Sequence, residues 1–490
     1  MPVAKDQLVG IALPECGGAR SSSEFGRAVL ADAVRSHDSD LAQVIESSPT
    51  WHASYPAAFR SMTALSATAA ETGFGIAADG LASTRALLRV AYGKSEASVA
   101  GAAWRDLGAD LATESVHGSS SAQCVLEVPF SGSVLSGQAL RDQLHRWRDD
   151  GIVEPGFAAA IERVIDNPDW LSMPGCQVVV IGAGAELGPY EPFTRWGATV
   201  LAVDLPGADR WGQLLQTART GAGSVRYPLG PWGSGLDVSQ HFPQLRRWIL
   251  TNTSERSKVV FGTYARASGV AQVELAAAVD LVAEDLLSLE NVTLAYLASP
   301  LDCYAVGAEV VAAARERWRE RGRRAVIQDM LRIASRSALF RPNYAFEVVD
   351  ANGNHWGLAD ALLPLQGANH ALARRLQRWR AQTAAAEGRS VSYNIAPLSW
   401  TQSVRDHRVL AGALHGAGAF GVEVFEAETA RVLMAAKLVS DVFAPEGPSA
   451  NPETTFYRGA AHGGLWRQPF EPKSVLGLAA AAGYPRAVFG

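Results

Sequence analysis

The pattern of hydrophobic and polar positions changes near residue 170. Before that point apolar residues recur mostly at helical spacing, as in FGRAVLADAVRSHDSDLAQVIES. After it, short apolar runs alternate with segments of helical period, beginning with CQVVVIG at residues 176–182. Short buried strands that alternate with helices build a parallel sheet with helices on both faces. The pattern therefore predicts a mostly helical N-terminal domain over residues 1–170, followed by an α/β domain.

The alternation continues to residue 443 and predicts a doubly wound parallel sheet over residues 171–443. An Arg-rich helical stretch with a hairpin around Asp350 interrupts it as an insertion over residues 306–362. Residues 444–490 contain many Gly and Pro residues, and we expect a loop-rich flap there, held on the body by its aromatic side chains. We expect strands in six segments, namely 176–182, 198–204, 223–230, 258–265, 291–300 and 390–397.

Composition narrows the functional classes. The chain has 490 residues, which is too long for one simple domain. Its 44 Lys and Arg oppose 49 Asp and Glu, giving a net charge of −5, so nucleic acid is not an expected partner. Four widely separated cysteines show neither a zinc-ligand spacing nor a disulfide framework. No apolar run approaches the roughly 20 residues of a membrane span. We therefore expect a cytoplasmic protein with no metal and no membrane partner.

The segment GAGAELGP, which follows the first expected strand, has the composition of a phosphate-binding turn. Such a loop needs glycines for a tight turn, for close approach to a pyrophosphate and for helix–strand contact. Gly182, Gly184 and Gly188 supply three glycines, yet neither common spacing of the motif is complete. Glu186 would bring a like charge close to a bound phosphate. Two interpretations stay open: a loop that binds a nucleotide, and a turn that only redirects the chain.

Asp204 ends the second expected strand, 22 residues after Gly182. A carboxylate at about this distance accepts hydrogen bonds from the ribose of an adenine dinucleotide, and it repels a 2′-phosphate. NAD is therefore favoured over NADP as the cofactor. Enzymes that use S-adenosylmethionine share the same arrangement, so the pattern indicates a nucleoside more firmly than a nicotinamide.

The segment GANHALARRLQRWRAQTAAAEGRSVSYNIAPLSWTQSV resembles the short-chain dehydrogenase/reductase superfamily, and the resemblance covers about residues 176–305 and 366–404. In that family a long helix carries Tyr-x-x-x-Lys, and the next strand ends in an Asn-x-Ile-x-Pro pattern before a Thr. Here the strand ends in Asn394-Ile395-Ala396-Pro397, and Thr401 follows. The resemblance implies that Asn394 and Thr401 lie at the nicotinamide side of the cofactor.

The same resemblance places the family's catalytic Tyr on His370 and its Lys on Arg374. The spacing of four is kept, so both side chains share one helix face. The family's catalytic Ser falls on Ser299. A histidine has an ordinary pKa near neutrality and would replace the tyrosine as proton donor. An arginine keeps its proton but adds positive potential.

These observations predict an NAD-dependent oxidoreductase that acts on a carbonyl, hydroxyl or enoyl group of a small or acyl substrate, as a homo-oligomer. One alternative is a catalytically degenerate binding or scaffold protein, which the changed Tyr and Lys favour. A weaker alternative is an S-adenosylmethionine-dependent transferase, for which an antiparallel strand near the end of the sheet would argue. Outside this domain, AHGGLWR at residues 461–467 indicates a turn that packs Trp466, with a substrate lid carrying His462 as the second interpretation.

Overall fold

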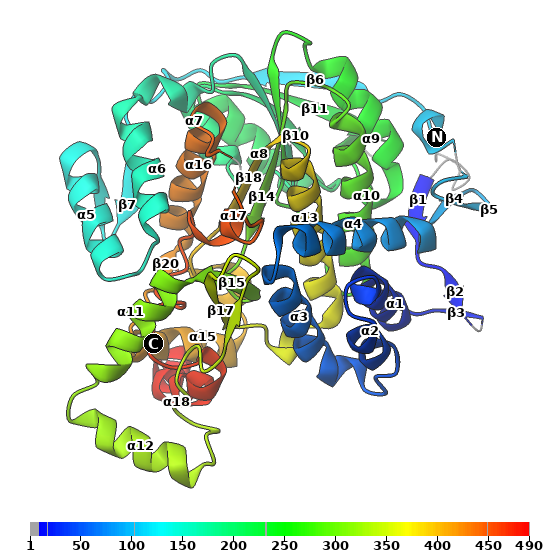
Figure 1. Cartoon of the computed structure of the whole chain (residues 1–490). Coiled ribbons are helices and arrows are strands. Elements are labelled where there is room, and N and C mark those ends of the chain that lie inside the picture. The colour runs from blue at the N-terminus through cyan, green and yellow to red at the C-terminus, as the bar shows by residue number, and fades with distance from the viewer. Residues whose placement is uncertain (1–8, 17, 102, 231–232, 448, 490) are drawn as a thin grey trace.

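The computed structural model describes residues 9–16, 18–101, 103–230, 233–447 and 449–489. The chain is a mixed α/β protein built on a mostly parallel central sheet, which runs through the middle of the molecule between two groups of helices (Figure 1). None of the described helices combines the length and the apolar character that crossing a bilayer requires.

The core of the sheet follows the strands that the sequence predicts. In spatial order these parallel strands are β11, β10, β9, β13, β14 and β18. The chain therefore starts at a central strand, adds two strands on one side, and then returns to add three on the other. Their bounds are β9 Cys176–Ile181, β10 Thr199–Val203, β11 Ser224–Gly230, β13 Lys258–Thr263, β14 Val292–Ala298 and β18 Ser390–Ile395.

Strand β9 shows why these runs form strands that are buried on both faces. Val179 and Ile181 point into one hydrophobic cluster, whereas Val178 and Val180 point into the other. Successive side chains of a strand alternate between the two faces of a sheet, so a continuous apolar run needs cover on both sides. Its β-branched residues suit this pleated, enclosed position.

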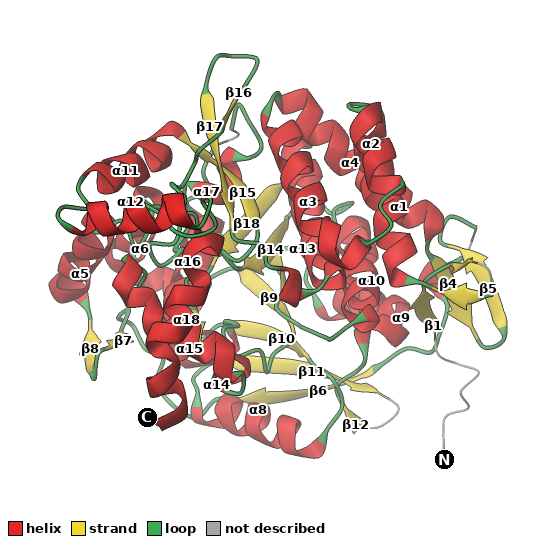
Figure 2. Cartoon of the chain, turned by 90° about the horizontal axis from the view of Figure 1, so that it is seen from below, coloured by secondary structure: helices red, strands yellow, loops and turns green. Residues whose placement is uncertain are grey.

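Helices provide that cover in two layers, which Figures 1 and 2 show on opposite sides of the strands. One layer contains α9 (Val238–Asn252), α10 (Val270–Leu286) and α13 (Ala368–Ala386). The other contains α7 (Tyr190–Trp196), α8 (Ala208–Thr220) and α16 (Ala427–Phe443). Of these helices, α7, α8, α9, α10 and α13 lie between successive parallel strands, as the alternation predicts.

The N-terminal region packs against both layers. Helices α1 (Ser22–Arg35), α3 (Trp51–Ala67) and α4 (Ala70–Leu87) share the hydrophobic cluster of α13, while α5 (Gly137–Asp149) and α6 (Pro155–Asp166) join the cluster of α16. Strand β6 (Ala112–His117) also extends the central sheet, antiparallel to β11. The region contains helices and short strands, and its core is continuous with that of the α/β part.

The insertion forms the expected helices and hairpin. It contains α11 (Ala308–Arg319), α12 (Arg324–Ala334) and a small antiparallel sheet of β15 (Cys303–Gly307), β16 (Glu347–Val349) and β17 (His355–Asp360). The predicted hairpin turn around Asp350 connects β16 with β17. Trp356 of β17 donates a hydrogen bond to the buried carboxylate of Asp350, which fixes this turn.

The C-terminal segment differs in part from the expected loop. Residues 444–447 and 449–471 are mostly irregular, with one short helix among them, α17 (Thr454–Tyr457), but α18 spans Pro472–Phe489. It packs closely on α15 (Arg408–Ala417) through small residues. A Cβ atom added at Gly416 would lie only 2.0 Å from the carbonyl oxygen of Ala479. This partner helix, distant in sequence, explains why a Gly- and Ala-rich end is helical.

Candidate functional site

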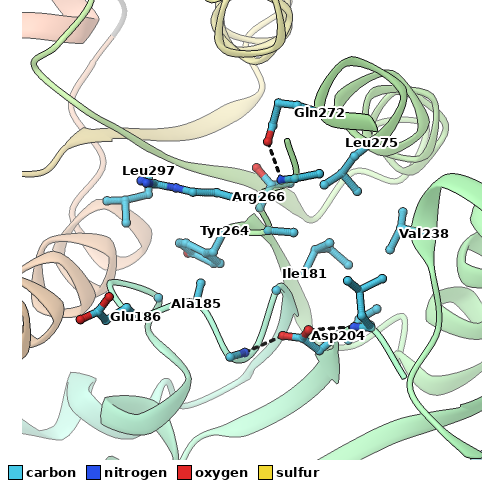
Figure 3. A pocket seen from close by; sticks show the side chains of 18 of the residues that line it. Ile181, Ala185, Glu186, Asp204, Val238, Tyr264, Arg266, Gln272, Leu275 and Leu297 are labelled. Atoms are coloured by element: carbon cyan, nitrogen blue, oxygen red, sulfur yellow. Dashed lines mark hydrogen bonds between the residues drawn. The ribbon is translucent and has the colours of Figure 1, made fainter. Parts of the chain in front are cut away.

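A cavity of about 450 Å³ opens at the carboxyl ends of β9, β10 and β13 (Figure 3). From β9 the chain continues to β10 on one side, and it later returns to β13 on the other side. The position between β10 and β13 is therefore the switch point of the sheet. Ligands of open α/β sheets bind in the crevice at such a point. Most of the sequence-predicted site residues line this cavity: Gly182, Gly184, Gly188, Asp204, His370, Arg374 and Thr401.

The glycine loop is tightly folded and needs glycine at its first position. Gly182 has a φ of +87°, and a Cβ atom there would lie 2.4 Å from the backbone nitrogen of Ala265. The loop therefore packs directly on the segment after β13. A side chain would separate these two walls of the cavity.

Most backbone donors of the loop already have partners inside the protein. The N–H groups of Gly182 and Ala183 donate to the carbonyl of Val203, that of Ala185 to Gly182, and that of Gly188 to Ala185. Gly184 donates to the Asp204 side chain over 2.7 Å. Within the fully described segment 182–188, this leaves only the N–H groups of Glu186 and Leu187 for a bound phosphate. The loop can therefore contribute few donors to an anion.

Asp204 occupies the predicted position after β10, and three hydrogen bonds hold its carboxylate. Oδ2 accepts the hydrogen bond from Gly184, while Oδ1 accepts from the N–H of Leu205 and from Arg210, each at 2.8 Å. The side chain of Arg210 is 46% exposed, whereas that of Asp204 is 10% exposed. A carboxylate offers about four acceptor positions. A ribose hydroxyl can therefore use the remaining one or displace the exposed guanidinium.

Glu186 does not face the centre of the cavity. Its carboxylate accepts a hydrogen bond of 2.9 Å from the backbone N–H of Gln402, at the start of α14 (Gln402–Arg405), and its carbonyl accepts one from Arg431. Figure 3 shows its side chain at the edge of the site, away from Asp204. The like-charge conflict that the sequence suggested is reduced by this arrangement.

Three nitrogen-bearing side chains that act on one another electrostatically line one part of the cavity. Arg266 follows β13, and His370 and Arg374 lie one turn apart on α13. Nη1 of Arg374 donates to the carbonyl of Leu301 over 3.2 Å. Among the described residues neither arginine has a carboxylate within ion-pair distance, although the more distant Glu186 acts on Arg266 electrostatically. This part of the cavity is therefore positively charged.

The environment of His370 keeps its ring neutral. Burial, together with the positive charges of Arg374 and Arg266, lowers the pKa of His370 to about 3. Limited hydration and the nearby Arg374 also lower the pKa of Arg266 to about 10, which still leaves it charged at neutral pH. This environment disfavours the protonated imidazole that the expected proton donor would require. A neutral ring can donate one hydrogen bond but holds no spare proton.

Two predicted site residues lie elsewhere. Ser299 follows β14, but its hydroxyl accepts a hydrogen bond from the N–H of Leu301 in a local turn, outside the lining of the cavity. Asn394 is buried in β18 and donates to Ser392 and to Asp441. Both side chains are thus engaged in structural hydrogen bonds, and the predicted group of Ser299, His370 and Arg374 is only partly assembled.

Other lining residues were not predicted, chiefly Arg210, Asp237, Ser239, Tyr264, Arg266 and Gln272. A sequence signal existed for part of this set. Tyr264 and Arg266 follow the β13 strand directly, and the carboxyl ends of neighbouring parallel strands meet at one edge of a sheet. The segment GTYARASG therefore belonged to the expected crevice, whereas its side-chain directions required the structure.

The candidate lid residue His462 is part of a buried cluster. It is fully buried, accepts the N–H of Gly464 at Nδ1, and lies 2.8 Å from a carboxylate oxygen of Glu154 through Nε2. Arg467 donates two further hydrogen bonds to the same carboxylate, and Trp466 stacks on the imidazole. This geometry supports the turn that packs Trp466 and not an exposed lid.

No group of three or more His, Cys, Asp or Glu residues within the described part of the chain could hold a metal ion. No family model, curated protein or solved structure matches this chain.

Proposed function

We propose that this chain is an NAD-dependent oxidoreductase with a Rossmann-like domain similar to the short-chain dehydrogenases. The observation that carries the proposal is the cavity at the switch point of the parallel sheet. It brings together the loop after β9, Asp204 after β10, and His370 with Arg374. The strand order β11-β10-β9-β13-β14-β18 is that of the doubly wound folds that bind dinucleotides in the crevice at the switch point.

The lining residues fit an extended dinucleotide in charge and position. Asp204 would hold the adenosine ribose, the cofactor would cross the loop containing Gly182 and Gly184, and the nicotinamide would point toward His370. The volume of about 450 Å³ lies within the usual range of cofactor sites, roughly 300 to 1,000 Å³. NAD remains favoured over NADP because the Asp204 carboxylate faces the ribose position.

Bound NAD(H) would supply or accept the hydride. The side chains of this chain would act on the substrate oxygen. Neutral His370 would donate a hydrogen bond, and the positive charge of Arg374 would stabilise the negative charge that develops on that oxygen. Since His370 holds no spare proton at neutral pH, solvent would deliver the proton. The substrate would carry a carbonyl, hydroxyl or enoyl group on a small or acyl skeleton.

A catalytically degenerate binding or scaffold protein is the second candidate. The observation in its favour is the number of loop N–H groups that already have internal partners. A transferase that uses S-adenosylmethionine is the third candidate, because β6 runs antiparallel to β11 at one edge of the sheet, although β18 runs parallel to β14 at the other.

Parallel ligand titrations test the proposal. Thermal unfolding would be followed with NADH, NADPH and S-adenosylmethionine, each at a series of concentrations. A ligand at 100 times its dissociation constant should stabilise the fold by about 2.7 kcal/mol. We expect the largest shift with NADH. A shift with S-adenosylmethionine alone would favour the transferase, and none with any ligand would favour the scaffold.

A further inference from the structure

Helix α13 carries four arginines, and three of them have carboxylate partners. Arg375 lies 4.0 Å from Asp302, Arg378 contacts Glu453, and Arg380 forms two hydrogen bonds with Asp280. The remaining one, Arg374, faces the cavity, and no acid of the described residues lies within ion-pair distance of it. The helix thus pairs its arginines with acids everywhere except at the site.

A second cation stands beside Arg374 on a different element. Arg266 comes from the loop after β13 and is close enough for Arg374 to lower its pKa. Figure 3 shows the Arg266 side chain extending across the cavity toward Leu297, above Tyr264. Two neighbouring guanidinium groups repel one another and are stabilised by an anion between them. Guanidinium groups match phosphate oxygens with two parallel hydrogen bonds.

The surroundings add to the same field. α13 begins at Ala368 without a side-chain cap, so the partial positive charge of its N-terminus lies near His370 in the first turn. The three lining carboxylates have partners elsewhere: Asp204 binds Arg210, Asp237 caps α9, and Glu186 binds the N–H of Gln402. The glycine loop, in contrast, retains few free donors.

From these contacts we infer that Arg266 and Arg374 form the anion subsite of the cavity and bind a phosphate or diphosphate group in place of the glycine loop. This inference rests on the proposed function for the location of the ligand but not for the chemistry of the subsite. The phosphate could belong to the dinucleotide or to a phosphorylated substrate, and both sources share this recognition.

Inorganic pyrophosphate and NADH are the probes, each measured by isothermal titration calorimetry on the full chain. The variants are Arg266→Gln and Arg374→Gln, with Arg374→Lys as a conservative replacement. Arg405→Gln is the matched control, because Arg405 is half exposed, pairs with Glu426 and lies beside the cavity without lining it. We expect each glutamine variant to weaken pyrophosphate binding at least tenfold, Arg374→Lys to weaken it less, and the control to leave it unchanged.

The source of the phosphate follows from a competition. If NADH and pyrophosphate exclude one another and the glutamine variants weaken both, the diphosphate is that of the cofactor. If NADH and pyrophosphate bind at the same time and the glutamine variants weaken only the binding of pyrophosphate, the subsite holds a phosphorylated substrate. Pyrophosphate that binds without NADH binding would overturn the proposed function and leave the subsite intact. Absent pyrophosphate binding, or an equal loss in Arg405→Gln, would overturn the subsite.

A stability measurement guards against misfolded variants. Without ligand, Arg266→Gln should unfold at the same or a higher temperature than the parent, because it removes the repulsion from Arg374. A residue with a purely structural role would give the opposite sign. A clear fall in that temperature would contradict the inference.

Discussion

The backbone N–H of Gly184 donates a hydrogen bond of 2.7 Å to Oδ2 of Asp204. This contact joins the loop after β9 to the end of β10. Two further donors, the N–H of Leu205 and the side chain of Arg210, also hold the carboxylate in place. The residue expected to bind a ribose therefore also fixes the shape of the loop. Binding and loop stability are coupled at this position.

Replacing Asp204 by Ala should affect both properties. Loss of the acceptor for Gly184 removes an exposed hydrogen bond and should lower the free energy of unfolding by about 0.5–1.5 kcal/mol. Affinity for NADH should fall at least tenfold, measured by calorimetry, while Asp209→Ala on the exposed start of α8 should change neither. Unchanged NADH affinity in a destabilised Asp204→Ala would show that the acid serves only the loop.

Gly182 should tolerate no side chain. Alanine in its left-handed conformation costs about 1–2 kcal/mol, and the clash with the Ala265 backbone adds to this cost. Gly212 is the matched control, since a Cβ atom there meets open space inside helix α8. Gly212→Ala should stabilise the protein by about 0.5–1 kcal/mol. Urea unfolding of both variants measures the two changes in stability, which should have opposite signs. Equal changes in the two variants would refute this account of the loop.

His370 should remain neutral far below its ordinary range. Its folded pKa of about 3 lies below the unfolded value of about 6.5, so protons bind preferentially to the unfolded chain between these values. The stabilising effect of the neutral ring is complete above pH 6.5 and is lost as the pH falls toward 3. NMR should show no titration of this ring between pH 8 and 5, and His370→Gln should flatten the acid side of the stability profile. A midpoint near 6.5 would contradict the crowding of positive charge around it.

The buried cluster of Glu154, His462 and Arg467 should be important for stability. Burial alone would raise the pKa of Glu154, but hydrogen bonds from Arg467 and His462 lower it below its ordinary value. Glu154→Gln leaves Arg467 without its counter-charge and should cost about 3–5 kcal/mol. Glu162→Gln breaks the more exposed contact with His145 and should cost about 1 kcal/mol or less. Similar losses in the two variants, measured by denaturant unfolding, would contradict a special role for the buried cluster.

Much of the central sheet could be predicted because its strands are continuous apolar runs. β9 can be recognised from its own residues, because Val178 to Ile181 are all apolar and both faces of the strand must therefore be covered. The loop glycines and Asp204 were found for the same reason, because they mark the ends of these strands. α18 was missed since its small residues gain helical stability only by packing on α15, which no local pattern reveals.

The sequence by itself determined the parallel strands of the central sheet, and therefore that Gly182, Asp204 and Arg266 follow strand ends. Only the tertiary structure decided which of their polar groups stay free. Hydrogen bonds and charge pairs join residues far apart in the chain, such as Glu186 with Gln402 or Arg378 with Glu453. Those partners turn Ser299 and Asn394 into structural residues and leave Arg266 and Arg374 facing the cavity. Whether a side chain can bind a ligand depends on which protein groups already engage it, and long-range packing sets those partners.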